Sequence, residues 1–261
     1  MTYTVNCSIL LTEIPLLERP AAAKAAGFDA VEFWWPFAEA VPADKDVDAF
    51  VSAIQDAGVQ LSGLNFFAGD MPAGDRGLVS WTGRGGEFKA NIAVVAAIGE
   101  RLGTKAFNAL YGNRLPESTP EAQDELALEN LVAAAKGIAE IGGTVLLEPV
   151  SGTPAYPLKT AADALAVIAK TAEYAGAGVD NIKHLAVNGD DVPAVIEQHA
   201  EDFGHIQIAD NPGRGAPGTG ELPLGEWIAR SRELGYGGYI GLEYKAPAAE
   251  AFQWAIRPVA G

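Results

Sequence analysis

The stretch His205-Ile206-Gln207-Ile208-Ala209-Asp210 decides how the fold of this chain is interpreted. It has the length and apolar content of a buried strand, and it runs into the glycine-rich segment 211–221, which is typical of a loop. A strand of a parallel sheet is buried on both faces, so His205, Gln207 and Asp210 would be costly there unless polar partners met them. The sequence therefore predicts polar partners around this strand.

Two other strand-like runs end in a single carboxylate. Run 144–148 is apolar up to Glu148, and run 239–243 is apolar up to Glu243. Chemistry in a parallel barrel gathers at the carboxyl ends of the strands, so Glu148, Gln207 and Glu243 are expected to converge at one end of the sheet.

Strand-like and helix-like segments alternate along the whole chain, which predicts a parallel sheet with crossover helices. No Pro-, Gly- or Ser-rich linker divides the sequence, so we expect one domain over residues 1–261. Pro20 fits a first helical turn, Gly58 a helix end and Thr119 an N-cap. The expected strands are 3–10, 30–34, 61–67, 105–110, 144–148, 182–187, 205–209 and 239–243, and the expected helices are 21–26, 46–57, 87–102, 120–141, 160–174, 192–203 and 224–234.

The predicted fold is an α/β TIM (β/α)8-type barrel whose sixth strand is short, re-registered or missing. The segment that follows residue 174 offers only a short and polar run before His184. Assigning the sixth strand to 182–187, with residues 188–191 as the loop after it, is the interpretation that keeps the barrel complete.

Composition excludes several classes of function. Eighteen Lys and Arg against thirty-four Asp and Glu give a net charge of −16, which disfavours a nucleic-acid partner or an anionic membrane surface. The sequence shows no apolar run of roughly 20 residues and no basic leader, so we expect a cytoplasmic protein. Its one cysteine, Cys7, is expected to be a small core residue.

Several motifs resemble the hydroxypyruvate isomerase family, which belongs to the xylose-isomerase-like TIM barrels. They are Leu147-Glu148-Pro149, His205 to Asp210, Pro212-Gly-Arg214, Pro217-Gly-Thr-Gly-Glu221 and Gly241-Leu-Glu-Tyr-Lys245, together with runs 11–19 and 25–33. The resemblance implies an aldose–ketose isomerase that converts hydroxypyruvate to tartronate semialdehyde with a divalent metal, Mg²⁺ or Mn²⁺. It implies that Glu148, Gln207 and Glu243 bind this metal and that the two glutamates also transfer the proton.

The sequence departs from the family at the fourth metal ligand. The family carries an aspartate three residues before a histidine that corresponds to His184, and Asn181 stands at that position here. Asp190 or Asp191 would substitute for it if the sixth strand were shifted. His184 itself is either a residue that orients the substrate or an ordinary histidine of the strand.

A small keto acid also needs a partner for its carboxylate. Arg76, Arg214 and Lys245 are the candidates for substrate binding, with Arg114 as a further one, because guanidinium groups recognise carboxylates in a bidentate manner. Trp34, Trp35 and Trp81 could wall the pocket, and the long segment 68–86 is expected to be a functional loop.

Three alternatives stay open at the level of sequence. The chain could be a sugar or sugar-acid isomerase or epimerase of the same fold, or a barrel that binds a small ligand without turnover because the aspartate is lost. A metal-dependent endonuclease is disfavoured by the charge and by the presence of only three histidines. A small molecule is the expected partner, and homo-oligomerisation is left open.

Overall fold

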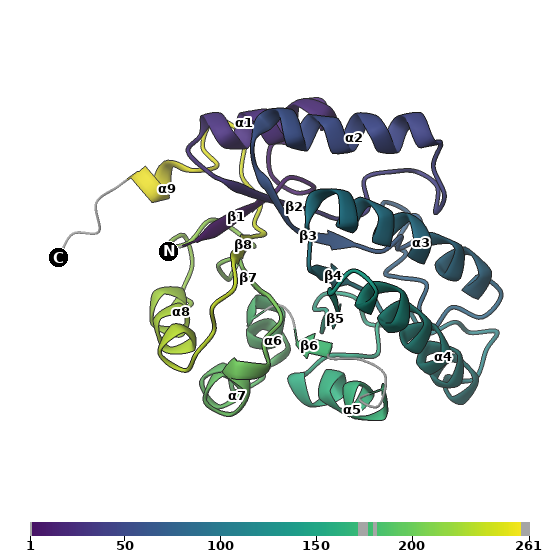
Figure 1. Cartoon of the computed structure of the whole chain (residues 1–261). Helices are drawn as coiled ribbons and strands as arrows, with labels where there is room; N and C mark the ends of the chain where they lie inside the picture. Colours follow the sequence, from purple (N-terminus) through teal and green to yellow (C-terminus); the bar gives the residue numbers. More distant parts are fainter. Residues whose placement is uncertain (1, 172–176, 180–181, 257–261) are drawn as a thin grey trace.

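The computed structural model describes residues 2–171, 177–179 and 182–256, and within them eight strands form one parallel sheet. The strand order is β6-β5-β4-β3-β2-β1-β8-β7, with helices on the outside of the strands (Figure 1). This arrangement confirms the predicted α/β barrel. The strands are β1 (Tyr3–Asn6), β2 (Ala30–Phe33), β3 (Gln60–Asn65), β4 (Ala106–Asn108), β5 (Thr144–Leu147), β6 (Ala177–Val179), β7 (Ile206–Ile208) and β8 (Ile240–Leu242).

The seven predicted helices occur in the predicted order, and the end signals that the sequence offered are used, while helices at Ile182–Asn188 and Gln253–Ile256 were not predicted. Pro20 lies in the first turn of α1, Gly58 ends α2 in the left-handed region at φ 63°, and the Thr119 hydroxyl caps α4 by accepting from Ala122 N–H at 3.2 Å. The helices are α1 (Arg19–Ala25), α2 (Asp44–Ala57), α3 (Gly85–Leu102), α4 (Pro120–Ala139), α5 (Ala161–Thr171), α6 (Ile182–Asn188), α7 (Val192–His199), α8 (Leu224–Glu233) and α9 (Gln253–Ile256), with 3-10 turns η1 (Leu16–Glu18) and η2 (Ala200–Asp202). The expected end of the fifth helix near residue 174 lies outside the described residues.

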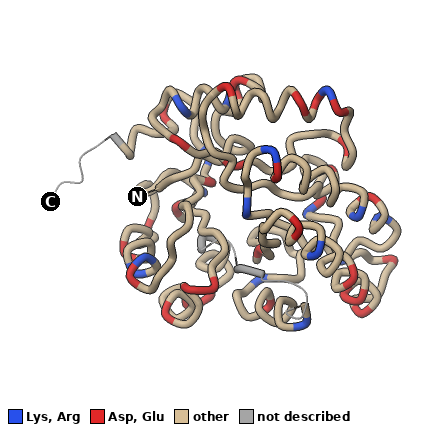
Figure 2. The backbone as a smooth tube through the Cα atoms, in the orientation of Figure 1, with Lys and Arg blue, Asp and Glu red and all other residues tan. Residues whose placement is uncertain are grey.

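Few charged residues lie on or next to the strands. Most Lys, Arg, Asp and Glu positions lie on the surrounding helices and loops (Figure 2). The exceptions are buried carboxylates, namely Glu32, Glu148, Asp210 and Glu243. Because an unpaired buried charge is costly, these four positions indicate where the barrel holds specific polar partners.

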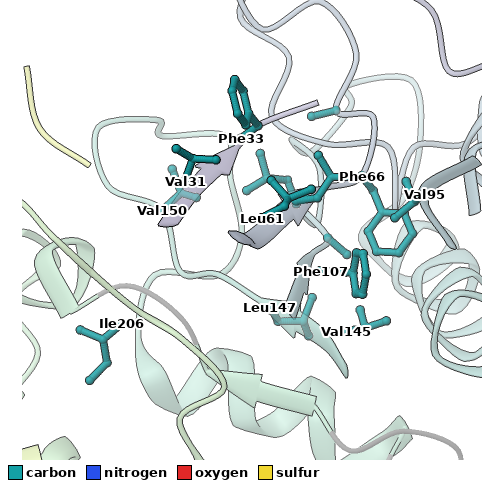
Figure 3. Packing of buried hydrophobic residues seen from close by; sticks show 14 of the residues in the cluster. Val31, Phe33, Leu61, Phe66, Val95, Phe107, Val145, Leu147, Val150 and Ile206 are labelled. Carbon is teal, nitrogen blue, oxygen red and sulfur yellow. The ribbon is translucent and has the colours of Figure 1, made fainter. Parts of the chain in front are cut away.

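The hydrophobic core lies between the strands and the helices that cover them. Phe66 and Phe107 lie beside Val95 of α3 (Figure 3), and their ring centroids are 6.5 Å apart. Cys7 is fully buried in this core, as predicted, and burial raises the pKa of its thiol. In the part of the chain that the structure describes, no helix combines the length and the apolar character needed to cross a membrane.

The expected sixth strand at 182–187 is wrong, because this segment forms helix α6. The structure instead places a short β6 at Ala177–Val179, where it pairs with β5. A strand would put Leu185 and Val187 on the same face. In the structure Leu185 is buried and Val187 is 41% exposed, while His184, Leu185 and Asn188 share the inward face at helical spacing.

This correction also shows what lies between the two ends of the sheet. Among the described residues no strand pairing joins β6 to β7, and α6 packs against β7. The helix brings the side chain of His184 to the end of β5, where it contacts Ser151. The segment expected to be a strand therefore contributes to the barrel end as a helix.

Candidate active site

Glu148 and Glu243 are the residues that directly follow β5 and β8, and both face one cavity. Each is buried, with exposed fractions of 5% and 3%, and the cavity they line has a volume of about 1040 Å³. One ligand atom each of Glu148, His184 and Glu243 lies within 4.8 Å of the others. Of the three residues expected to converge, Glu148 and Glu243 meet at this cavity, whereas Gln207 does not border it.

Glu148 is held by groups from three elements. The Asn108 amide at the end of β4 donates to Oε2 at 2.5 Å, and His184 Nε2 of α6 lies 3.5 Å from Oε1. The fully buried Tyr156 hydroxyl donates to the main-chain carbonyl of Glu148 and accepts from Tyr111 N–H. These contacts fix both the backbone and the carboxylate of Glu148.

Glu243 is held by an aromatic and a basic side chain. The Trp34 indole N–H donates to Oε1 at 2.9 Å, and Arg214 Nη2 donates to Oε2 at 2.5 Å. Arg214 also donates from Nε to the main-chain carbonyl of Glu243 at 3.2 Å. The carboxylate of Glu243 therefore lies in an ion pair with a guanidinium group.

Arg214 adopts a backbone conformation that is uncommon for a residue with a side chain. Its φ is 55°, in the left-handed region, and its carbonyl accepts from Lys245 N–H at 2.7 Å. Strain of this kind is kept where the surrounding structure enforces it, often at functional sites. Here it directs the guanidinium of the glycine-rich loop at Glu243.

The loop that carries Arg214 is anchored by Asp210. Burial on its own would raise the pKa of this carboxyl, but main-chain N–H groups of Gly220, Leu222, Asn211 and Gly218 stabilise the charged form, and the net pKa lies below its ordinary value. Three of these N–H groups lie 2.9 to 3.0 Å from the carboxylate oxygens. The predicted need of Asp210 for polar partners is met by its own loop.

We expect Asp210→Asn to lower the free energy of unfolding at pH 7 by about 1–3 kcal/mol, because an amide cannot accept these hydrogen bonds equally well. A depressed folded-state pKa contributes stability above the unfolded value of about 3.9 and loses it as the pH falls through the folded value. The difference from the parent should therefore shrink below about pH 4, as measured by urea unfolding at several pH values. Asp29→Asn, at a side chain that is 85% exposed, is the control, and an equal loss at all pH values would contradict the assignment.

Gln207 and His205 belong to a second polar cluster inside the barrel, centred on Glu32. His205 Nε2 lies 2.6 Å from Glu32 Oε2, while Gln207 Nε2 and Asn6 Nδ2 donate to Oε1 at 2.6 and 2.9 Å. All four residues are buried and border a small cavity of about 10 Å³ that also touches Asn108. The polar partner that the sequence required for His205 and Gln207 is thus Glu32.

Glu32 and Asn108 were not singled out from the sequence, although a signal for one of them existed. Run 30–33 is an apolar strand interrupted by one carboxylate, the same feature that drew attention to Glu148 and Glu243. Asn108 gave no such signal, because an asparagine at a strand end is typical of an ordinary turn.

Only some of the candidates for substrate binding lie at the large cavity. Arg76, Arg214 and His184 line the large cavity, together with Trp34 and Trp35. Among the described residues that border it, Lys245, Arg114 and Trp81 do not occur. Lys245 is exposed, and Trp81 lies under the Arg84 guanidinium, 5.1 Å from its ring centroid.

Asp190 and Asp191 do not replace the missing aspartate, because both cap helices. Asp190 accepts from Ala161 N–H at 2.8 Å at the start of α5, and Asp191 accepts from Ala194 N–H at 3.1 Å at the start of α7. The expectation that a shifted strand would deliver one of them is therefore wrong.

The donor groups at the site fit a hard divalent cation. Two buried carboxylates and one imidazole lie close together in a cavity, and oxygen-rich sets of this kind suit Mg²⁺ or Mn²⁺. Positively charged or polar partners already hold each carboxylate, so the ligand oxygens are oriented before any cation enters.

Comparisons with known proteins agree with this geometry. A family model described as a xylose isomerase-like TIM barrel matches residues 20–257. A Streptomyces coelicolor protein that carries a provisional hydroxypyruvate isomerase name is 51% identical, over 97% of this chain and 94% of its own. Hydroxypyruvate isomerase of Escherichia coli K12 is 30% identical, over 94% and 93% of the two chains.

Similarity to solved structures extends along the whole fold. A crystal structure from Brucella melitensis, described as a family 2 AP endonuclease, matches with a TM-score of 0.86 and 28% identity, over 98% of this chain and 99% of that one. Together with the sequence relatives and the two glutamates at the ends of β5 and β8, this match leads to one conclusion. The chain belongs to the hydroxypyruvate isomerase family of the xylose isomerase-like TIM barrels.

Proposed function

We propose that this protein interconverts hydroxypyruvate and tartronate semialdehyde (2-hydroxy-3-oxopropanoate). The observation that carries the proposal is the pair of buried glutamates, Glu148 and Glu243, which face one cavity from two strand ends. The names of the two sequence relatives support this substrate.

The reaction moves hydrogen between neighbouring carbons without net oxidation. A base removes a proton from C3 of hydroxypyruvate, and the C–H electron pair forms the C2–C3 double bond of the enediolate while the C2 carbonyl becomes a single-bonded oxygen. An acid returns a proton to C2, and the proton of the C3 hydroxyl passes to the C2 oxygen, so that C3 becomes the aldehyde. Two carboxylates on either side of the substrate meet this requirement, and Glu148 and Glu243 are the pair we assign to it. Asn108 and His184 keep Glu148 in place, while Trp34 holds Glu243.

A divalent cation, Mg²⁺ or Mn²⁺, would be held by Glu148 and Glu243. The resemblance also implies Gln207 as a ligand, but Gln207 borders the small cavity around Glu32 and its amide nitrogen donates to Glu32, so we leave it in that cluster. When bound, the cation supplies positive charge that stabilises the enediolate. Arg214 donates to Glu243 and holds its carboxylate in place beside the cation position.

Arg76 is the residue we assign to the substrate carboxylate. It lines the cavity from the loop after β3, and its Nη1 donates to the carbonyls of Met71 and Asp75 at 2.9 and 2.6 Å. These two bonds orient the guanidinium group, and within the described part of the chain its Nε and Nη2 have no acceptor. A planar group with such donors suits a carboxylate.

The size of the cavity favours a second candidate function, isomerisation of a longer sugar acid. A volume of about 1040 Å³ is at the upper end of small-molecule sites, and a three-carbon acid fills only part of it. The same two glutamates would serve that reaction, so chain length of the substrate is the property that separates the two candidates.

A nucleic-acid substrate is not part of the proposal, although the Brucella structure is described as an endonuclease. The net charge of −16 opposes a phosphate backbone. Figure 2 shows acidic positions spread over the outer helices of this chain.

The test is a calorimetric titration of metal-stripped protein with Mn²⁺, followed by isomerase assays with hydroxypyruvate and with a four-carbon 2-keto sugar acid. We expect stoichiometric binding at micromolar or better affinity, loss of binding in Glu243→Gln, and turnover that depends on added metal. Faster turnover of the four-carbon acid would select the second candidate. Absence of binding and of turnover with both acids would refute the proposal and leave a barrel that binds without catalysis.

A further inference from the structure

We propose that the main-chain N–H of Ser151 fixes His184 as the tautomer protonated on Nε2, so that His184 donates a hydrogen bond into the site and is not a metal ligand. The assignment concerns one of the three groups that lie together at the cavity. It decides which atoms of this chain remain for a cation.

One hydrogen bond of His184 has a fixed direction. Ser151 N lies 2.9 Å from His184 Nδ1, and a main-chain N–H can only donate. Nδ1 must therefore accept, which requires that it carries no proton. The Ser151 hydroxyl lies 2.7 Å from the same nitrogen and is free to rotate, so it adapts to this arrangement as a second donor.

The proton of the His184 ring then lies on the opposite nitrogen, Nε2. A neutral ring carries one proton, so an accepting Nδ1 places that proton on Nε2. Nε2 lies 3.5 Å from Glu148 Oε1, an acceptor, which agrees with a donor at this position. The contact is long for a strong hydrogen bond, but its polarity is the expected one.

This tautomer is incompatible with a cation bound at Nε2. A histidine that binds a metal through Nε2 must carry its proton on Nδ1. That proton would face the Ser151 N–H across 2.9 Å, and two donors cannot satisfy each other. His184 is 4% exposed, and the Ser151 N–H already occupies the position next to Nδ1. Glu148 and Glu243 remain as the ligands from this group of three.

Ser151 is therefore a positioning residue that acts through His184. Resting on the proposed function, the Nε2–H would donate to the oxygen on which negative charge develops during isomerisation, or hold Glu148 as a base. Helix α6 makes this arrangement available, because it brings His184 to the loop that follows β5.

The primary test is the protonation pattern of the ring nitrogens in protein labelled with ¹⁵N-histidine, recorded by long-range ¹H–¹⁵N correlation at one alkaline pH. The chain has three histidines, and a His184→Gln variant identifies the signals of His184. We expect protonated Nε2 and unprotonated Nδ1, both without metal and after addition of diamagnetic Mg²⁺. A proton on Nδ1 in either state would overturn the proposal.

A Ser151→Ala variant is the matched control, because it keeps the main-chain N–H and removes only the hydroxyl. The tautomer should be unchanged in this variant, and a change would assign the effect to the hydroxyl. In a parallel Mn²⁺ titration, His184→Gln should bind within about threefold of the parent, whereas a loss of tenfold or more would identify His184 as a ligand. If the parent binds no Mn²⁺ the proposed function fails, but the spectrum of the metal-free protein still decides the tautomer.

Discussion

Replacing Glu148 by Gln should lower kcat for isomerisation by about a thousandfold. Removing a positioned general acid or base typically costs 10²–10⁴ in rate, and Gln cannot accept a proton from C3 of the substrate. The side chain keeps its size, so the cavity and the substrate contacts should persist and KM should change far less than kcat. Because Glu148 is also assigned to the cation, stopped-flow or coupled assays at a Mn²⁺ concentration that saturates each protein would measure both constants.

The same variant must be shown to fold. Glu148 accepts from Asn108, and an amide can present its oxygen to that donor, so the far-ultraviolet circular dichroism and the urea midpoint should stay close to those of the parent. Glu140→Gln is the matched control, because Glu140 is exposed at the end of α4 and its substitution should leave kcat unchanged. A kcat within tenfold of the parent in a folded Glu148→Gln protein would remove Glu148 from the catalytic pair.

The position of this pair could be derived from sequence because it depends on a strong local signal. An apolar strand that ends in one carboxylate is rare unless the carboxylate has a partner, and parallel strands place such ends together. Glu148 and Glu243 met both conditions. The positions of Thr119 and Gly58 at helix ends could be predicted equally well, because capping depends only on neighbouring residues.

The sixth strand could not be derived in the same way. Segment 182–187 contains apolar residues that fit either a short strand or one face of a short helix, and local pattern does not separate the two. Packing of α6 against β7 decides for the helix, and this is a tertiary contact that the local pattern does not contain. The tautomer of His184 is harder still to predict from the sequence, because it depends on Ser151, a loop residue 33 positions away.

Glu32 was overlooked because its partners come from another part of the chain. His205 is 173 residues away from Glu32 along the sequence, and Gln207 is 175 residues away. The polar residues of β7 correctly predicted that a polar partner exists. The identity of that partner could not be predicted, because β2 and β7 are brought together only through β1 and β8, which lie between them in the sheet. Which residues of two strands face each other is a tertiary property and cannot be predicted from either strand alone.

His205→Ala should lower the free energy of unfolding by about 1–3 kcal/mol, the usual cost of leaving a buried acceptor without one of its hydrogen-bond partners. The side chains of Glu32 and His205 are 4% and 6% exposed, so water cannot replace the lost contact. Glu32 would keep the amides of Gln207 and Asn6 as donors, which places the expected loss within this range and not beyond it. Urea unfolding at pH 7, with equal slopes for parent and variant, would measure the difference.

Two further variants separate the buried pair from a general effect of losing a histidine. His199→Ala is the control, because His199 lies 3.7 Å from Asp202, whose side chain is 67% exposed, and such surface pairs contribute about 0–1 kcal/mol. Adding Glu32→Gln to His205→Ala should recover part of the stability, since a neutral amide removes the uncompensated charge while still accepting from Gln207. If the double variant were less stable than His205→Ala alone, the loss would come from the cavity left by the ring and not from the charge of Glu32.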